Sequence, residues 1–354
     1  DTSILFMYIG ESHMSIQASG TNQVTGTILS GMRPTGRLHL GNYLGALQNW
    51  VDLQHSYKCI YTVVDIHALT TIESNDDIAN IKPNIFEMVL DWLAAGVDPE
   101  RSTIFIQSHV PEVMTLNTLL GMVTPLGWLM RVPTFKEKVR QMEKTEDSVN
   151  YGLVGYPILQ TADIILYKAD TVPVGQDQLP HLELAREIVR RFNNRFGDTF
   201  PEPQAKLTEV PLIVGLDGQQ KMSKSLDNHI DLASSNDDTT KRVLTAFTDP
   251  QRTTRNTPGR PKICNVFSLH HVFTKDSDVP VIEQECLNAT RGCVDCKRQL
   301  AQNVNTYLEP LRERRAELSK RPDDIKDILT SGAKTARAIA ESTIEEVYSK
   351  MGLS

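Results

Sequence analysis

Apolar residues in the first two thirds of the chain occur either as short continuous runs or at helical spacing. The continuous runs predict buried β-strands at residues 27–30, 59–65, 103–107 and 171–174. Helical spacing predicts helices from about Asn42 to Leu53 and from Ser74 to the glycine at position 96. Strands that alternate with helices in this way predict an α/β fold with a Rossmann-like, doubly wound parallel sheet. Ligands of such sheets bind beyond the carboxyl ends of the strands, where the Gly- and Pro-rich turn after Ser30 is expected to lie.

The pattern changes in the last third of the chain, where only helical periodicity is found from Asp237 onward. Apolar stripes over residues 300–318 and 325–351 predict long helices, and hence an all-helical second domain. The predicted organisation is a loose extension over residues 1–25, an α/β domain over 26–214, a loop and linker over 215–230, and a helical domain over 231–354. The extension is proposed because its residues are rich in Ser, Thr, Gly and Gln.

Composition and charge narrow the class of protein. The 354 residues are 40% hydrophobic and 23% charged, as in a globular protein. No apolar run approaches the roughly 20 residues of a membrane span, and residues 4–9 lack the basic flank of a signal peptide. The net charge of -7 argues against a protein that coats nucleic acid, although a local basic face remains compatible with it. Five cysteines, one of them apart from the others, fit a reducing cytoplasm better than a disulfide framework.

Two short motifs carry residues suited to nucleotide chemistry. Residues 34–42 read PTGRLHLGN, and residues 221–225 read KMSKS. Glycines at positions 36 and 41 let the backbone approach a nucleotide closely, and His39 can donate from a ring nitrogen to a phosphate oxygen. Lys221 and Lys224 can neutralise the charge that builds on a departing pyrophosphate. The simpler alternatives are a solvated surface loop for the two lysines and a structural histidine at position 39.

In this order, the two motifs resemble the HIGH and KMSKS signatures of class I aminoacyl-tRNA synthetases. Asn42 stands where HIGH has its second histidine, as in the tryptophanyl members. Residues 63–68, 134–138, 155–167 and 172–178 resemble further blocks of that family, and the resemblance extends over residues 27–354.

The resemblance implies a catalytic α/β domain, a helical anticodon-binding domain, and catalytic roles for His39, Lys138, Lys221 and Lys224. It implies ATP contacts from Arg33, Pro34, Thr35, Gly41, Asn42, Gly175, Gln176, Asp177, Leu212, Lys221, Met222, Ser223, Lys224 and Ser225. Two residues depart from the family: Gln176 in place of the usual Glu removes one negative charge beside the nucleotide, and Arg33 in place of Gln adds a donor for ATP or the substrate carboxylate.

The block at residues 155–167 suggests which amino acid is activated. An indole is a flat apolar ring with one N–H donor, so its pocket needs apolar walls and one acceptor. Asp163, between apolar residues of a predicted helix, is expected to accept that N–H. The other residues expected to bind tryptophan are Leu29, His67, Tyr156, Gln160, Val172 and Val174. The alternatives are a helix-surface carboxylate for Asp163, and ordinary core residues for Tyr156 and His67.

Cys264, Cys286, Cys293 and Cys296 form the pattern C-x21-C-x6-C-x2-C. Zinc ribbons usually have two C-x2-C pairs, whereas this chain has one, so the uneven spacing suits an iron–sulfur cluster at least as well. The pattern also resembles a bacterial subgroup of tryptophanyl-tRNA synthetases that carries a 4Fe–4S cluster near the anticodon-binding region. Zinc, or plain buried cysteines, remain the alternatives.

The sequence therefore predicts a cytoplasmic, membrane-independent enzyme that activates L-tryptophan with ATP and Mg²⁺ and transfers it to tRNA-Trp. A homodimer is implied by the resemblance alone. Tyrosine activation is the nearest alternative, because tyrosyl enzymes share the fold and both signatures. Two others are a small nucleotidyltransferase and a non-charging paralogue that binds tryptophan or tRNA.

Overall fold

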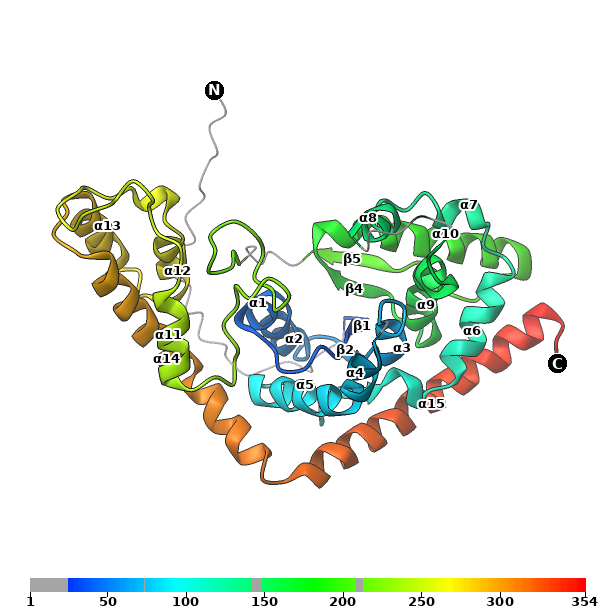
Figure 1. The fold of residues 1–354 in the computed structure, drawn as a ribbon. Helices are drawn as coiled ribbons and strands as arrows, with labels where there is room; N and C mark the ends of the chain where they lie inside the picture. Colours follow the sequence, from blue (N-terminus) through cyan, green and yellow to red (C-terminus); the bar gives the residue numbers. More distant parts are fainter. Residues whose placement is uncertain (1–24, 73, 142–144, 146–147, 208–212) are drawn as a thin grey trace.

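A five-stranded sheet forms the centre of the chain. The computed structural model describes residues 25–72, 74–141, 145, 148–207 and 213–354. The strands are β1 (Thr27–Met32), β2 (Lys58–Val63), β3 (Ser102–Ile106), β4 (Thr171–Val174) and β5 (Gln204–Leu207). Every pairing is parallel and the order is β3-β2-β1-β4-β5, which confirms the predicted doubly wound sheet (Figure 1). β5 is an additional edge strand that the sequence pattern did not predict.

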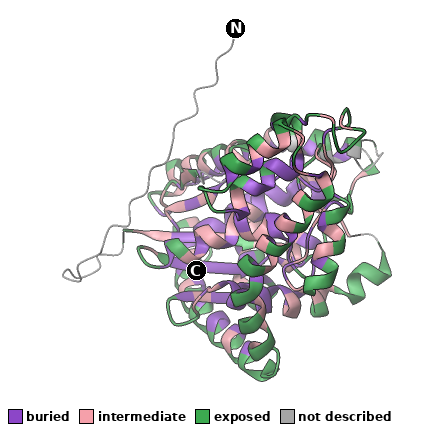
Figure 2. Ribbon diagram, turned by 90° about the vertical axis from the view of Figure 1, so that its left-hand side faces the viewer, coloured by how far each residue is buried: buried purple, intermediate pink, exposed green. Residues whose placement is uncertain are grey.

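Helices cover both faces of the sheet because successive strand residues point to opposite sides. In β1, buried Ile28 belongs to one core and its neighbour Leu29 to the other. The first core is covered by α1 (Leu40–Asn42), a π-helical segment η1 (Tyr43–Leu47), α2 (Gln48–Leu53), α5 (Ile81–Ala95) and α14 (Cys293–Leu318). The second is covered by α6 (Glu112–Gly121), α9 (Tyr151–Leu166) and α10 (Leu179–Phe196). Figure 2 shows the buried residues concentrated between these layers.

Short elements connect the layers of the α/β part. They are α3 (Asp65–Ala68), α4 (Asn75–Ala79), η2 (Gln107–His109), α7 (Leu126–Leu129), α8 (Pro133–Gln141) and η4 (Gln176–Gln178). Beyond residue 235 the elements are α11 (Asn236–Leu244), η5 (Pro261–Ile263), α12 (Asn265–Phe273), α13 (Val279–Leu287), α14 and α15 (Pro322–Met351). All of these are helical, as the periodicity of the sequence indicates. No helix in the described ranges is both long enough and apolar enough to cross a membrane.

The C-terminal helix α15 packs mainly against strand β3 and helix α6 of the α/β part. α14 descends on one side of the molecule and α15 rises along the other, as Figure 1 shows. Leu329 of α15 joins the first core and Ala333 the second, so the helix crosses the edge of the sheet at β3. Arg337 of α15 also donates to Glu112 of α6, with Nε 3.0 Å from Oε1. The sequence placed residues 322–351 with the helical domain, because an apolar stripe predicts a helix but not its partner.

Gly332 lies where α15 crosses β3. A Cβ at this position would lie 1.9 Å from the backbone oxygen of Ile104, a contact that only a shift of the helix could relieve. We expect Gly332→Ala to lower the free energy of unfolding by about 1–3 kcal/mol or more, the usual range for overpacking. Chemical denaturation measures this loss. Gly121→Ala in α6 is the control, because a Cβ there meets nothing within 4 Å. Equal stabilities for the two variants would contradict the close contact.

Candidate active site

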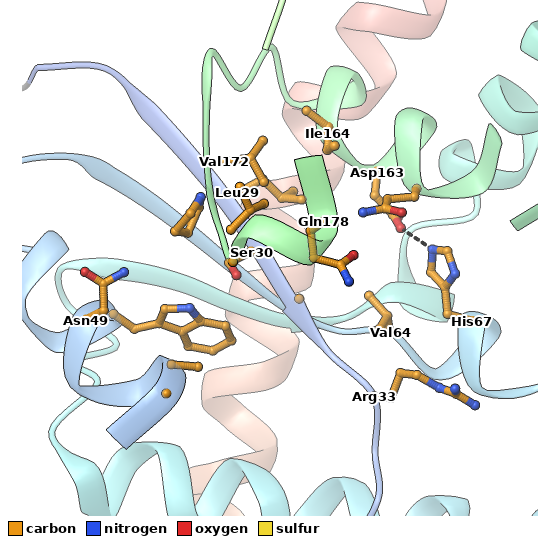
Figure 3. Close-up of a pocket in the computed structure, with 18 of the residues that line it drawn as sticks. Leu29, Ser30, Arg33, Asn49, Val64, His67, Asp163, Ile164, Val172 and Gln178 are labelled. Carbon is orange, nitrogen blue, oxygen red and sulfur yellow. Dashed lines mark hydrogen bonds and ion pairs between the residues drawn. The ribbon is translucent and has the colours of Figure 1, made fainter. Parts of the chain in front are cut away.

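A cavity of about 380 Å³ lies beside the carboxyl ends of β1 and β4. These strands are neighbours in the sheet but distant in the chain, so the cavity occupies the point where the strand order reverses, the usual ligand site of doubly wound sheets. β1 contributes Leu29 to Gly31, β4 contributes Val172 to Val174, and α9 contributes the polar side chains opposite them. Figure 3 shows these side chains converging on one space. Its volume lies within the range of about 300–1,000 Å³ typical of small-molecule sites.

All seven residues predicted to bind tryptophan line this cavity. They are Leu29, His67, Tyr156, Gln160, Asp163, Val172 and Val174. Arg33 and Gly175, predicted to contact ATP, line it as well. The lining also includes Asn49 and Trp50 of α2, which the sequence analysis did not select. Their spacing in an amphipathic helix gives no signal that distinguishes a pocket residue from a core residue.

Asp163 is a buried and hydrogen-bonded polar group of the cavity, and only 4% of its surface is exposed. His67 Nε2 lies 2.9 Å from Oδ2 (Figure 3). Gln107 Nε2 donates to both carboxylate oxygens at 2.8 Å. A carboxylate offers about four acceptor positions, and these contacts use three of them. One acceptor position on Oδ1 is therefore left for a further donor. Gln107 was missed by the sequence analysis, since a single Gln after a strand carries no recognisable pattern.

A series of hydrogen bonds fixes the hydroxyl group of Tyr156. Its hydroxyl lies 2.6 Å from His181 Nε2, and His181 Nδ1 lies 3.1 Å from Gln178 Oε1. Gln178 in turn donates to Asp177 Oδ2 at 2.9 Å. The cavity thus combines apolar walls from the strands with polar groups whose orientation is set by neighbouring polar side chains, of which Gln107 and His181 lie outside the lining.

The first signature forms a turn that leads into α1. Asn42 Oδ1 accepts the backbone N–H of His39 at 3.1 Å, so the Asn found in place of histidine stabilises the turn itself. Nδ1 of His39 is buried and has no hydrogen-bond partner among the residues that the structure describes, which leaves it available to a ligand. A Cβ at Gly41 would lie 3.1 Å from the His39 ring and 3.3 Å from Met222 Cβ. The glycine therefore allows the two signatures to pack against each other.

The second signature folds over the first. Lys224 Nζ donates to the carbonyl oxygen of Thr35 at 2.9 Å, although the two residues are 189 positions apart. The loop is held by buried Asn228, whose Oδ1 accepts the N–H of Ser223 at 2.7 Å. Lys221 is exposed, and its backbone forms an antiparallel bridge with Val214. Asn228 was not predicted to matter, although it lies only three residues after the pentapeptide.

The other residues predicted to contact ATP differ in their exposure and in their hydrogen bonds. The Arg33 guanidinium donates to Ala68 O at 3.1 Å and to Thr71 Oγ1, and its buried Nε has no partner in the described part of the chain. Gln176 and Asp177 are exposed on η4, beside the cavity-lining Gly175. Pro34 is buried, whereas Ser225 is exposed. Residue Leu212 and the side chain of Lys138 lie outside the described part of the structure.

His39 gives the site a testable pH dependence. Burial, and then the nearby His229, Lys224 and Lys221, lower the pKa of His39 to about 4. An unfolded histidine titrates near 6.5, so between these values the unfolded chain binds more protons and stability falls as the pH falls. We expect His39→Gln to make the dependence of unfolding free energy on pH shallower, by up to about one proton in this window. Denaturation at several pH values measures the slope, and an unchanged slope would contradict the assignment.

The four clustered cysteines line a second, small cavity of about 20 Å³ among α12, α13 and α14. Arg252 Nη1 lies 3.5 Å from Cys286 Sγ, and Arg291 lines the same cavity. Burial raises the pKa of Cys264, Cys286 and Cys296, the last to about 12. Among the described residues, no three His, Cys, Asp or Glu side chains are grouped closely enough to hold a metal ion. The cysteines thus face one space but are not arranged as a formed metal site.

Comparison with known proteins agrees with this geometry. A family model described as tRNA synthetases class I (W and Y) matches residues 21–309. The chain is 41% identical to a tryptophan–tRNA ligase of Aquifex aeolicus and 44% identical to one of Thermotoga maritima; each alignment covers 92% of this chain and 99% of the relative. A crystal structure of tryptophanyl-tRNA synthetase from Campylobacter jejuni, complexed with ADP and tryptophan, has a TM-score of 0.83 and 35% identity over 92% of this chain and 100% of that chain.

The doubly wound sheet, with both signatures beside its switch point, is the catalytic fold of a class I aminoacyl-tRNA synthetase. Within that class, the chain belongs to the family of tryptophanyl and tyrosyl enzymes.

Proposed function

We propose that this chain is a tryptophan–tRNA ligase, which activates L-tryptophan with ATP and transfers it to tRNA-Trp. The observation that carries the proposal is the buried Asp163 carboxylate, which keeps one acceptor position while facing a cavity with apolar walls. That combination matches an indole, which presents an apolar ring and a single N–H. The identity of 36–44% to curated tryptophan–tRNA ligases over 92% of the chain supports the same substrate.

The reaction needs no side-chain nucleophile. The tryptophan carboxylate attacks the α-phosphorus of ATP, a carboxylate O–P bond forms, and the bond to the bridging oxygen of pyrophosphate breaks. Charge then accumulates on pyrophosphate, where Lys221, Lys224 and the neutral ring of His39 are suited to stabilise it. Mg²⁺ enters bound to the ATP phosphates. The adenylate is then attacked by the terminal ribose of the tRNA, which releases AMP.

Two alternatives predict different substrates or no reaction. A tyrosyl enzyme would arrange its polar groups around a phenol oxygen, whereas the cavity that Asp163 faces is also lined by Val172, Val174 and Ile164. A non-charging paralogue would not need the packed signatures, but Lys224 donates to the carbonyl oxygen of Thr35, and a Cβ at Gly41 would lie 3.3 Å from Met222 Cβ.

Aminoacylation tests the proposal directly. The purified chain, incubated with ATP, Mg²⁺, radiolabelled tryptophan and a tRNA-Trp transcript, should form acid-precipitable tryptophanyl-tRNA. A transcript with a changed anticodon serves as the control for the tRNA. Tryptophan binding without charging of any tRNA would support the paralogue instead.

We further propose that the cysteines at positions 264, 286, 293 and 296 hold a 4Fe–4S cluster, with zinc as the alternative. Their convergence on one cavity, with Arg252 and Arg291 beside them, supports the proposal. Loading requires the side chains to turn toward a common centre and the thiols to lose protons. Burial opposes that loss at Cys264, Cys286 and Cys296, whose pKa values it raises. The cluster would tie α12, α13 and α14 together as a structural group.

Protein prepared without oxygen should be brown and contain iron and sulfide in equal amounts. Cys293→Ser should lose both, whereas Cys59→Ser, a buried cysteine of β2, should keep them. Colourless protein with stoichiometric zinc would refute the cluster in favour of zinc. Anaerobic protein that remains free of metal after reconstitution with iron and sulfide would refute both.

We also propose that the helical region from residue 231 binds the anticodon arm of the tRNA, and that the enzyme is a cytoplasmic homodimer. Exposed apolar side chains directly after α6 and on α7 and α9 (Met122, Leu126 and Tyr151) are among the described residues that support a further protein contact. Light scattering during size-exclusion chromatography distinguishes a dimer from a monomer.

A further inference from the structure

A buried carboxylate joins α14 to the loop that carries the first signature. Asp91 of α5 has 0% of its surface exposed. Its Oδ2 accepts the backbone N–H of Leu38 at 2.6 Å, and its Oδ1 accepts Nε of Arg315 at 2.6 Å. The Arg315 guanidinium also reaches Glu87, one turn earlier on α5, with Nη2 2.5 Å from Oε2. Because Leu38 precedes His39 directly, Arg315 is two hydrogen bonds away from the signature backbone.

A second arginine of α14 holds the segment that follows the KMSKS loop. Arg312, one helical turn before Arg315, donates from Nε to the carbonyl oxygen of Leu232 at 3.0 Å. The other two nitrogens of the same guanidinium donate to Asn236 Oδ1 at 2.7 Å, to Asn305 Oδ1 at 2.9 Å and to Thr239 Oγ1 at 2.7 Å. This arginine is therefore fixed by several partners while it contacts the backbone at Leu232.

The two segments held by these arginines are hydrogen-bonded to each other. The N–H of Leu232 donates to the carbonyl oxygen of Leu38 at 2.9 Å, and the N–H of Leu40 donates to the carbonyl oxygen of Ile230, also at 2.9 Å. His39 and Asp231 form an antiparallel bridge between them. A closed path therefore runs from Arg315 through Asp91, Leu38 and Leu232 to Arg312, and α14 completes it.

We propose that Arg312 and Arg315 are positioning residues that hold the backbone of the first signature against the segment following the second, and so set the ATP side of the active site. The inference rests on the proposed activation of tryptophan by ATP. A displacement of the reacting groups by about 1 Å can lower the rate about 10²-fold. Contacts that fix His39 relative to Lys224 therefore have a large effect on the reaction rate. Tryptophan binding should change little, because the residues predicted to bind it lie on β1, α3, α9 and β4, outside the segments 38–40 and 230–232.

Arginine is suited to this position because its planar fork can reach two carboxylates at once. Arg315 does so with Nε on Asp91 and Nη2 on Glu87, and a lysine cannot reproduce that geometry. Burial raises the pKa of Asp91, and Arg315 and the N–H of Leu38 oppose this by favouring the charged form. Removal of Arg315 would leave that carboxylate buried without its ionic partner, so it would no longer fix Leu38 in the same place.

The test compares Arg315→Met and Arg312→Met with Arg314→Met. Arg314 lies on the same helix and donates to Ala94 O of α5 at 2.7 Å; within the described residues it forms no hydrogen bond with either signature segment. In tryptophan-dependent pyrophosphate exchange, Arg315→Met should lower kcat about tenfold to a hundredfold and raise the KM for ATP several-fold, with the KM for tryptophan changed less than about twofold. Arg312→Met should likewise lower kcat and raise the KM for ATP. Arg314→Met should change none of the three constants by more than about twofold. Equal effects on the KM values of both substrates, or equal effects of Arg314→Met, would overturn the proposal.

Two further measurements separate positioning from loss of fold and from failure of the proposed function. If Arg315 acts through Asp91, the double variant Asp91→Asn with Arg315→Met should react no more slowly than Arg315→Met alone. A rate lowered by the product of the two single effects would contradict the path. Hydrogen–deuterium exchange of peptides spanning residues 37–40 and 230–232 requires no activity. These amides should exchange faster in Arg315→Met and Arg312→Met than in Arg314→Met. If the unmodified chain shows no tryptophan-dependent exchange reaction, the proposed function fails, and the amide rates alone then decide the positioning role.

Discussion

Asp163→Ala is expected to lower kcat/KM for tryptophan in pyrophosphate exchange by about 10²-fold, while the KM for ATP changes little. A hydrogen bond to a charged group contributes about 1.5–3 kcal/mol, which corresponds to about tenfold to 150-fold. The substitution also leaves the donors of His67 and Gln107 without their acceptor in a buried site, which adds to the loss. Steady-state exchange rates at varied tryptophan and saturating ATP measure the effect.

The matched control is Asp327→Ala, which removes a carboxylate from an exposed position on α15. Its kcat/KM should remain within about twofold of the unmodified chain, as is usual for a surface substitution. An Asp163→Ala variant that behaves in the same way would show that the carboxylate does not contact the substrate.

Replacing Lys224 by methionine is expected to lower kcat by about 10²- to 10³-fold, the range found when one group that stabilises transition-state charge is removed. The KM for tryptophan should remain within about twofold, because the charge on pyrophosphate develops only as the bond breaks. Lys224 already lies against the first signature through Thr35, and burial lowers its pKa, opposed by the charges of Asp231 and Asp91. Lys221→Met should have an effect in the same range.

Lys241→Met is the control for this pair, since Lys241 is an exposed lysine of α11 whose partner Asp238 is exposed too. Single-turnover formation of tryptophanyl-adenylate separates the chemical step from product release. A Lys224→Met variant that forms adenylate at the rate of Lys241→Met would exclude the proposed role of the loop in the chemical step.

The sequence predicted the sheet well because four of its strands are short apolar runs between helical segments. β4 spans the predicted residues 171–174, and β1 extends the predicted run by two residues, to Met32. β5 was missed because Gln204–Leu207 is an edge strand with exposed ends and no continuous apolar run. Edge strands need fewer apolar residues, so their sequences differ little from those of loops.

The cavity was predictable only where residues lie in recognisable blocks. Tyr156, Gln160 and Asp163 share one face of α9, and the family resemblance pointed to that face. Gln107 and Asn228 could not be found in this way, because each acts through hydrogen bonds to residues far away or in a loop. Asp91 is similar: its sequence position in an apolar helix suggests nothing, and only the fold brings Leu38 and Arg315 to it.

The most direct test of tryptophan activation is ATP–pyrophosphate exchange measured in parallel with tryptophan and with tyrosine. We expect exchange that depends on tryptophan, saturates with it, and remains at background with tyrosine at the same concentrations. The indole N–H and the acceptor position of Asp163 are the reason for that preference. Exchange supported by tyrosine alone, or tryptophan binding with no exchange, would contradict it.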